Sequence, residues 1–299
     1  MEDQLIKAVA YDGQVRLSSL VATHMVQEGC QRHDTWSTAS AALGRSLMGG
    51  ALLASDIKDD AIITLKIMGN GPVGKILVTA NGKGEVKGYL DQPHVSLEEN
   101  SEGKLDVKGA VGEEGSLTVI KDLGLKEPFS GQVPLVSGEL AEDLTYYLAV
   151  SEQIPSAVGL GVLVNPDESI QAAGGWMIQM MPGATEETIQ AVEEAVQSLP
   201  HVTQLIEEGM DASQIANRLL PQGDVKILDT RTVTFQCSCS KERFSKGLIS
   251  LGEKEIQQLI DEDGQAEAVC HFCNEKYAYN RQELEDLLAL SRSSSDKKK

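Results

Sequence analysis

Four of the five cysteines in this 299-residue chain lie near its C-terminus in two close pairs. Cys237 and Cys239 form a C-x-C pair, and after 30 intervening residues Cys270 and Cys273 form a C-x-x-C pair. Four thiolates are the donor set of a tetrahedral structural zinc site, in which each Zn–S bond is about 2.3 Å long. The residue types and their spacing therefore predict that these cysteines bind one Zn²⁺ ion.

Local patterns indicate how the two pairs are positioned. Hydrophobic residues and both cysteines alternate in the run 233–239, so a strand there would place the sulfurs of Cys237 and Cys239 on one face. The C-x-x-C pair is typical of a tight turn, which would close the site from the other side. His271 lies within this second pair, but four sulfurs complete the coordination shell, so we expect it to be a neighbour of the metal and not a ligand.

Four basic residues lie close to the cysteines in the sequence, and two interpretations are open. They could stabilise thiolates electrostatically, or they could be solvated surface charges. They are Lys241, Arg243, Lys246 and Lys276.

Composition excludes several classes of partner. The net charge of −19 disfavours nucleic acid and anionic membrane surfaces, since both attract clustered Lys and Arg. No apolar run reaches the roughly 18 residues of a spanning helix, and the acidic start MEDQ is unlike a signal peptide. We therefore expect a cytoplasmic protein, in whose reducing compartment clustered cysteines bind metal or act in redox chemistry. Cys30 stands alone and is expected to be a small packed side chain.

Residues 1–182 predict an α+β domain with a mixed, mostly antiparallel sheet and packed helices. Hairpins are expected around the turn signals Asp12-Gly13 and Asn81-Gly82. Between them, residues 23–55 have a helical pattern rich in small side chains, which would permit close packing. Further strands are expected at 61–68, 117–123, 129–137, 156–164 and 170–181, with a helix at about 139–152.

The segment Gly69–Lys75 matches the phosphate-loop pattern G-x-x-x-x-G-K. Ile76 stands where that motif needs Ser or Thr, and the residues that follow are strand-like, so no helix N-terminus would face a phosphate. We interpret the segment as a turn between strands and expect no nucleotide site.

The sequence pattern of residues 183–223 predicts a linker of short helices. Thr185 and Asp211 can cap two of them. Each helix is near or below the 12 to 15 residues or so that a helix needs to be stable alone, so packing on neighbouring domains must order them. One apolar face stands out and is a candidate client-binding surface, consisting of Ile189, Val192, Val196 and Leu199.

Residues 224–290 are expected to form a small zinc-binding domain with one helix near 252–260 and another after Tyr279. The polar tail 291–299 is expected to be disordered. A module of this size buries too little surface to be robust alone, and structural zinc contributes about 10 to 16 kcal/mol of binding free energy to folding. Oxidation would expel the metal because a disulfide sulfur is no longer a thiolate ligand. Four cysteines permit three pairings, and spacing alone does not choose among them.

Several stretches together resemble the 33 kDa chaperonin family of redox-regulated heat-shock chaperones, over essentially all of residues 1–290. They are GNGPVGKILV, VKGY, FSGQVPLVSGELAEDLTYYLAVSEQIPSAVGLGVLV, AAGGWMIQMMPG and the module CSC…CHFC. The family's zinc and redox cysteines fall on Cys237, Cys239, Cys270 and Cys273.

The resemblance implies a holdase, not an enzyme, that works without ATP and is inactive while reduced and zinc-bound. It further implies that oxidants form the disulfides Cys237–Cys239 and Cys270–Cys273, that zinc leaves, and that the zinc domain and linker unfold. The active form would bind unfolding proteins and form a homodimer.

Two other functions remain open from the residues themselves. A zinc-ribbon adaptor with a purely structural metal would retain zinc under mild peroxide. A thiol-disulfide oxidoreductase shares the C-x-x-C pair, but there the pair begins a helix in a βαβ unit, whereas here it follows an acidic, turn-rich stretch.

Overall fold

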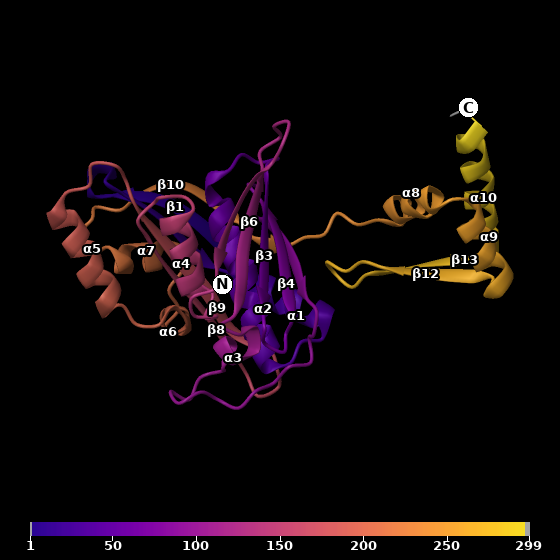
Figure 1. Cartoon of the computed structure of the whole chain (residues 1–299). Coiled ribbons are helices and arrows are strands. Elements are labelled where there is room, and N and C mark those ends of the chain that lie inside the picture. The colour runs from indigo at the N-terminus through magenta and orange to yellow at the C-terminus, as the bar shows by residue number, and fades with distance from the viewer. Residues whose placement is uncertain (1, 297–299) are drawn as a thin grey trace. The chain divides into compact units, whose positions relative to one another are not determined.

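The computed structural model describes residues 2–296, with side chains described as far as Arg292. The chain divides into two compact units, Met1–Gln236 and Cys237–Lys299 (Figure 1). Helices and mainly antiparallel strands occur along the whole chain, which confirms the α+β class. Among the described residues, no helix has both the length and the apolar character needed to cross a bilayer.

The first unit contains two sheets and the helices around them. Its strands are β1 (Gln4–Ala10), β2 (Val15–Val21), β3 (Ile62–Gly69), β4 (Lys75–Asn81), β5 (Glu85–Leu90), β6 (Gly115–Asp122), β7 (Phe129–Pro134), β8 (Ser156–Val164), β9 (Ile170–Met180), β10 (Lys226–Thr232) and β11 (Thr234–Phe235). Its helices are α1 (Thr23–His33), α2 (Ser37–Leu53), α3 (Val107–Val111), α4 (Ala141–Val150), α5 (Glu186–Ser198), α6 (Val202–Glu207) and α7 (Ala212–Leu219), with short 3-10 turns η1 (Tyr11–Gly13) and η2 (Ala54–Asp56).

The two sheets are antiparallel apart from one short pairing. The five-stranded sheet has the order β10-β1-β2-β9-β8, and the six-stranded sheet has the order β11-β5-β4-β3-β6-β7. Among the described strands, only β11 runs parallel to its neighbour, β5. Both expected hairpins are confirmed, β1 with β2 and β4 with β5.

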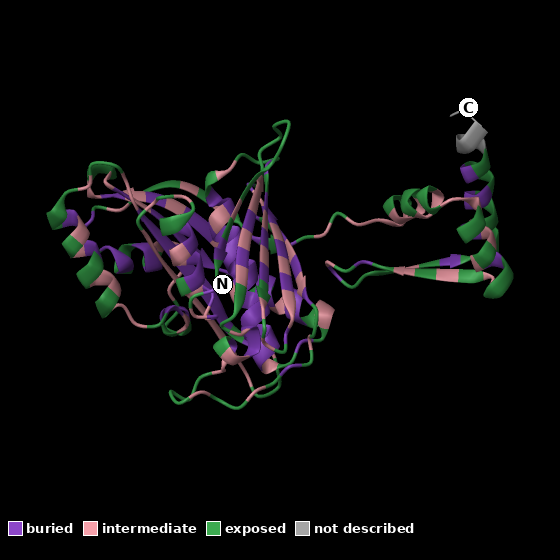
Figure 2. Ribbon diagram, in the orientation of Figure 1, coloured by how far each residue is buried: buried purple, intermediate pink, exposed green. Residues whose placement is uncertain are grey.

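Helix α2 lies between the two sheets and is buried along most of its length (Figure 2). It packs on β8 and β9 from one sheet and on β4 and β5 from the other. Its glycines permit this approach: a Cβ on Gly44 would lie 2.9 Å from Val162, and one on Gly50 would lie 2.7 Å from Val78. The small residues of this helix therefore allow close packing against both sheets.

The segment expected to be a linker forms helices, but these helices belong to the core of the first unit. Thr185 and Asp211 cap α5 and α7 by accepting hydrogen bonds from backbone N–H groups. Helices α6 and α7 pack on β9, β8, β2 and β1, on the face of the five-stranded sheet opposite α2. Buried side chains from these helices share one hydrophobic cluster with the sheet; they include Val192, Val202, Leu205, Ile206, Ile215, Ala216 and Leu219.

The first unit extends past the boundary at 224 that the sequence pattern suggested. Strand β10 pairs with β1 in the register Gln4 to Thr232, and β11 extends the other sheet. Most β10 side chains are exposed, including Ile227 at 46% and Leu228 at 64%, so its backbone pairing with β1 is the main attachment. Because this pairing joins two segments that lie far apart in the sequence, local periodicity does not reveal it.

The second unit has its own small hydrophobic core. Its elements are α8 (Lys241–Leu251), α9 (Glu253–Glu262), β12 (Gln265–Val269), β13 (Lys276–Asn280) and α10 (Arg281–Asp296). Its buried core side chains are Ile256, Ile260, Tyr279, Leu284, Leu287 and Leu288. The sequence pattern predicts helices at α9 and α10 but not at α8. Part of the tail expected to be disordered, 291–296, continues α10, and 297–299 lie outside the described residues.

The glycine-rich segment Gly69–Lys75 is a turn between β3 and β4, as expected. A Cβ on Gly69 would lie 1.9 Å from the Val111 carbonyl oxygen, so glycine is required there by close backbone approach. The segment leads directly into a strand, which leaves no helix N-terminus to face a phosphate.

Candidate metal centre

The first cysteine pair lies in an irregular segment of the second unit. Strand β11 ends at Phe235, and no regular structure covers 236–240. The expectation that Cys237 and Cys239 continue a strand is therefore wrong. Because regular strand geometry does not constrain 236–240, the chain can curve there, and the two thiols approach a common point without sharing one strand face.

The second pair occupies the turn of the β12–β13 hairpin. The Cys270 N–H donates to the Glu275 carbonyl at 2.9 Å, and the Asn274 N–H donates to the Cys270 carbonyl at 2.7 Å. Asn274 has φ of 57°, a left-handed conformation that asparagine tolerates well. These backbone bonds make the tight turn predicted for C-x-x-C, with Cys270 and Cys273 both buried.

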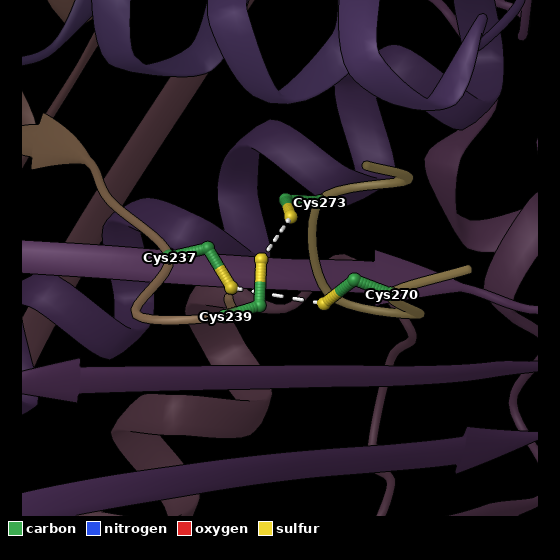
Figure 3. Close-up of side chains that lie close together, drawn as sticks. All are labelled: Cys237, Cys239, Cys270 and Cys273. Atoms are coloured by element: carbon green, nitrogen blue, oxygen red, sulfur yellow. Dashed lines mark hydrogen bonds between the residues drawn. The ribbon is translucent and has the colours of Figure 1, made fainter. Parts of the chain in front are cut away.

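The four sulfur atoms converge on one point (Figure 3). The Cys237 and Cys270 sulfurs are 3.8 Å apart, and the Cys239 and Cys273 sulfurs are 3.3 Å apart. All four lie within 4.8 Å of one another. A Zn–S bond of about 2.3 Å gives a tetrahedron with edges of about 3.8 Å, so the cluster has the size of a zinc site. Disulfide sulfurs would be about 2.05 Å apart, and all five cysteines are thiols here.

The donor set therefore fits a metal ion held by four thiolates. His271 is exposed and lies outside the cluster, which agrees with its interpretation as a neighbour of the site. Cys30 is buried in α1, where its thiol lies 3.8 Å from the Ser40 carbonyl and burial raises its pKa. The structure thus brings together the four cysteines that the sequence selects and leaves the fifth in the core.

A tyrosine hydroxyl is the closest polar neighbour described for Cys239. The Tyr277 hydroxyl lies 3.2 Å from its sulfur. Partial burial acts to raise the pKa of Cys239, but hydrogen bonds from Tyr277 and the neighbouring thiols outweigh it, so the pKa is lowered. Burial raises the pKa of Cys273 strongly.

Of the four basic residues near the cysteines, the three lysines pair with carboxylates, and the arginine contacts the segment between Cys237 and Cys239. Lys241 pairs with Glu283, and Lys246 and Lys276 pair with Glu242 and Glu267. The fourth, Arg243, donates two hydrogen bonds of 2.9 Å to the carbonyl and hydroxyl oxygens of Ser238. Of the two interpretations, solvated surface charge fits the three lysines, while the arginine holds the peptide between Cys237 and Cys239.

The candidate client-binding face is covered in this structure. Val192 is 6% exposed and belongs to the core cluster of the first unit. Val196 and Leu199 are partly buried against the same cluster, and Ile189 is half-buried. The face is thus turned toward the sheet while the cysteines are thiols.

Comparisons with known proteins agree with this architecture. The profile of the family described as Hsp33 protein matches residues 3–280. The chain belongs to the Hsp33 family. A protein named 33 kDa chaperonin from Shouchella clausii is 56% identical over 96% of this chain and 98% of its own length. Another of that name, from Enterococcus faecalis, is 55% identical over 96% of each chain.

A solved structure has the same fold. The crystal structure of the 33 kDa chaperonin from Thermotoga maritima, a heat shock protein 33 homologue, superposes with a TM-score of 0.91 at 36% identity. The match covers 98% of this chain and all of that chain. The Hsp33 chain described here is therefore a chaperone by family, and its four-cysteine cluster is consistent with zinc.

The sequence does not select Tyr277, and it offers Arg243 only as one of four basic residues near the cysteines. Neither has a motif spacing to the cysteines that would single it out. Tyr277 reaches Cys239 only because the hairpin places one face of β13 beside the irregular segment. Arg243 reaches Ser238 because α8 begins directly after the first pair, capped by Ser240.

Proposed function

We propose that this Hsp33 chain is a redox-regulated holdase that needs no ATP and has no catalytic turnover. In this proposal the four cysteines bind Zn²⁺ while reduced, and the reduced protein is inactive. Oxidation expels the metal and exposes surface that binds unfolding proteins and prevents their aggregation. The cytoplasm is the expected site of action, and the active form is expected to be a homodimer.

The observation that carries the proposal is the position of the sulfur cluster within the second unit. It joins the irregular segment 237–239 to the tip of the β12–β13 hairpin. The hydrophobic core of this unit is small, so the metal centre supplies much of its stability. A unit held together in this way unfolds when its ligands are consumed.

The electrons and atoms of this oxidation balance when hydrogen peroxide is the oxidant. Each pair of thiolates transfers two electrons to one peroxide, an S–S bond forms, the O–O bond breaks, and two protons convert the products to two waters. The pairs we propose are Cys237–Cys239 and Cys270–Cys273. Two disulfides consume all four ligands, so the Zn²⁺ ion leaves.

Unfolding that follows release of the metal would spread to the neighbouring segments, because the chain connects them to the second unit. Strand β10 contributes few buried side chains, and α6 and α7 are short helices that depend on packing. Once the second unit unfolds, β10 is therefore expected to detach at low cost, whereas detachment of α6 and α7 also requires exposing their buried core side chains. This would expose the face formed by Ile189, Val192, Val196 and Leu199 to clients.

Light scattering from a denaturant-unfolded client, measured without ATP, tests the proposal. We expect the reduced, zinc-loaded protein to leave aggregation unchanged, the peroxide-treated protein to suppress it, and thiol reductant to reverse the suppression. If neither state suppresses aggregation and zinc survives mild peroxide, the proposal is wrong and a structural zinc adaptor is the better interpretation.

A further inference from the structure

The side chain of Tyr277 joins two parts of the second unit. Its hydroxyl lies 3.2 Å from the Cys239 sulfur, while its ring packs against the small core, with its centroid 5.1 Å from that of Phe244. It sits on β13 opposite Ala268 of β12, so the paired hairpin fixes its position. Tyr277 therefore contacts both the metal centre and the hydrophobic core of the second unit.

The direction of this hydrogen bond follows from the chemistry of the metal-bound state. A cysteine that binds a metal is a thiolate and carries no proton. The phenol of Tyr277 must then be the donor and the Cys239 sulfur the acceptor. Hydrogen bonds to a charged acceptor are stronger than those between neutral groups.

We propose that Tyr277 is a positioning residue that restrains the reaction of the Cys239 sulfur with oxidant. This rests on the proposed redox function. Peroxide is attacked by a sulfur lone pair, and the Tyr277 hydrogen bond occupies a lone pair and withdraws charge from it. This lowers the nucleophilicity of the sulfur, so the metal-loaded centre reacts with oxidant more slowly than it would without Tyr277 and opens at a higher oxidant concentration.

The chain offers a matched control two residues further along β13. Tyr279 is 2% exposed, lies in the same small core and donates its hydroxyl to the Lys241 carbonyl at 2.9 Å. Tyr277→Phe and Tyr279→Phe each remove one hydroxyl from this strand. Only Tyr277→Phe removes a hydrogen bond to a thiol.

Zinc release into a chromogenic chelator, with and without peroxide, tests the proposal in the full-length protein. We expect Tyr277→Phe to speed peroxide-driven release about threefold to tenfold, the range that follows from a lost charge-assisted hydrogen bond and partial charge development on sulfur. Peptide mass spectrometry should show the added oxidation at Cys239. Without peroxide, the rate of chelator-driven zinc release from Tyr277→Phe should rise no more than the rate from Tyr279→Phe. An unchanged peroxide-driven rate, or a rise that Tyr279→Phe reproduces, would overturn the proposal.

A second readout needs no oxidant. In cobalt-substituted protein, loss of a hydrogen bond to a ligand sulfur should shift the thiolate-to-cobalt charge-transfer band in Tyr277→Phe and leave it in place in Tyr279→Phe. Identical spectra for wild type and Tyr277→Phe would contradict the hydrogen bond itself. Release of zinc without any chaperone activity would instead contradict the proposed function and leave the comparison between the two tyrosines valid.

Discussion

At the scale of single residues, the centre depends on thiolate ligands that serine cannot replace. Serine keeps the size of cysteine but offers a hydroxyl, which is a far weaker ligand for Zn²⁺ than a thiolate. Cys273 is 3% exposed, so solvent cannot readily supply a replacement ligand in its place. Three sulfurs would then be left to hold the ion.

We predict that Cys273→Ser loses most of its zinc during purification and that the second unit unfolds. The control is Cys30→Ser, which changes the buried cysteine of α1 outside the cluster. It should cost about 1 kcal/mol of stability through burial of a hydroxyl and retain roughly one zinc per chain. Metal analysis of both variants checks this, and equal zinc contents would contradict the assignment.

The residues of the site differ in how far the sequence reveals them. The cysteines follow from residue type and spacing, because four thiolates in two close pairs have few other uses. Tyr277 and Arg243 do not, since their contacts depend on strand pairing and on where α8 begins. The ligand residues can be recognised from their local sequence spacing, whereas the residues that hydrogen-bond to the site are brought there by the tertiary structure.

At the scale of elements, α5 is attached to the first unit by few side chains. Val192 is its most buried apolar residue, and most of the helix surface is solvated. Val192→Ala should cost about 1 to 3 kcal/mol and speed amide hydrogen exchange across 184–199. Gln197→Ala, on the exposed face of the same helix, should leave exchange unchanged. If amide hydrogen exchange across 184–199 is the same in both variants, α5 is not held to the first unit through the face that contains Val192.

The end of α4 is tied to β6 by a polar contact that depends on pH. Burial opposes ionisation of Glu152, but Lys121, with Nζ 2.6 Å from its carboxylate, and the Tyr147 hydroxyl together hold its pKa below the ordinary 4.5. A lowered pKa in the folded state means that Glu152 stabilises the fold above about pH 4.5. This stabilisation is lost as pH falls through the lowered value.

We therefore predict that Glu152→Gln lowers the stability of the first unit at neutral pH and flattens its loss of stability in acid. The control Glu127→Gln changes an exposed carboxylate and should reproduce the wild-type pH profile. Denaturant unfolding between pH 3 and pH 7, a range chosen to span the ordinary carboxyl pKa, provides the test. Parallel profiles for Glu152→Gln and wild type would contradict this role.

Much of the element order could be predicted from periodicity, and the exceptions have physical causes. The sequence pattern does not reveal α8 because Gly247 interrupts it, although Phe244 and Leu248 give this helix an apolar face. The pairing of β10 with β1 was missed because sequence patterns do not report which strands meet. The helices of 183–223 were expected, but their place in the core of the first unit depends on that same long-range packing.

At the scale of the whole molecule, the two units have separate hydrophobic cores and should respond differently to loss of metal. The first unit has two sheets and a helix buried between them, whereas the second has a small core and the sulfur cluster. Structural zinc contributes about 10 to 16 kcal/mol, more than the stability of most small domains. Its removal should therefore unfold the second unit and loosen the segments next to it, while the two-sheet core around α2 stays folded.

We predict that a strong chelator under reducing conditions abolishes hydrogen-exchange protection across 237–296 and preserves it in α2 and its neighbouring strands. Added zinc should restore protection. Simultaneous loss of protection in both units would show that they form one cooperative structure, contrary to their separate cores.

The most direct test of the central claim is a peroxide titration of the reduced, zinc-loaded protein. Released zinc, remaining thiols and suppression of client aggregation are measured on the same samples. The account predicts that all three change together, with about two peroxides consumed and one zinc released per chain, as two disulfides and one four-thiolate site require. Suppression that appears while zinc and thiols are retained, or complete zinc release without suppression, would contradict it.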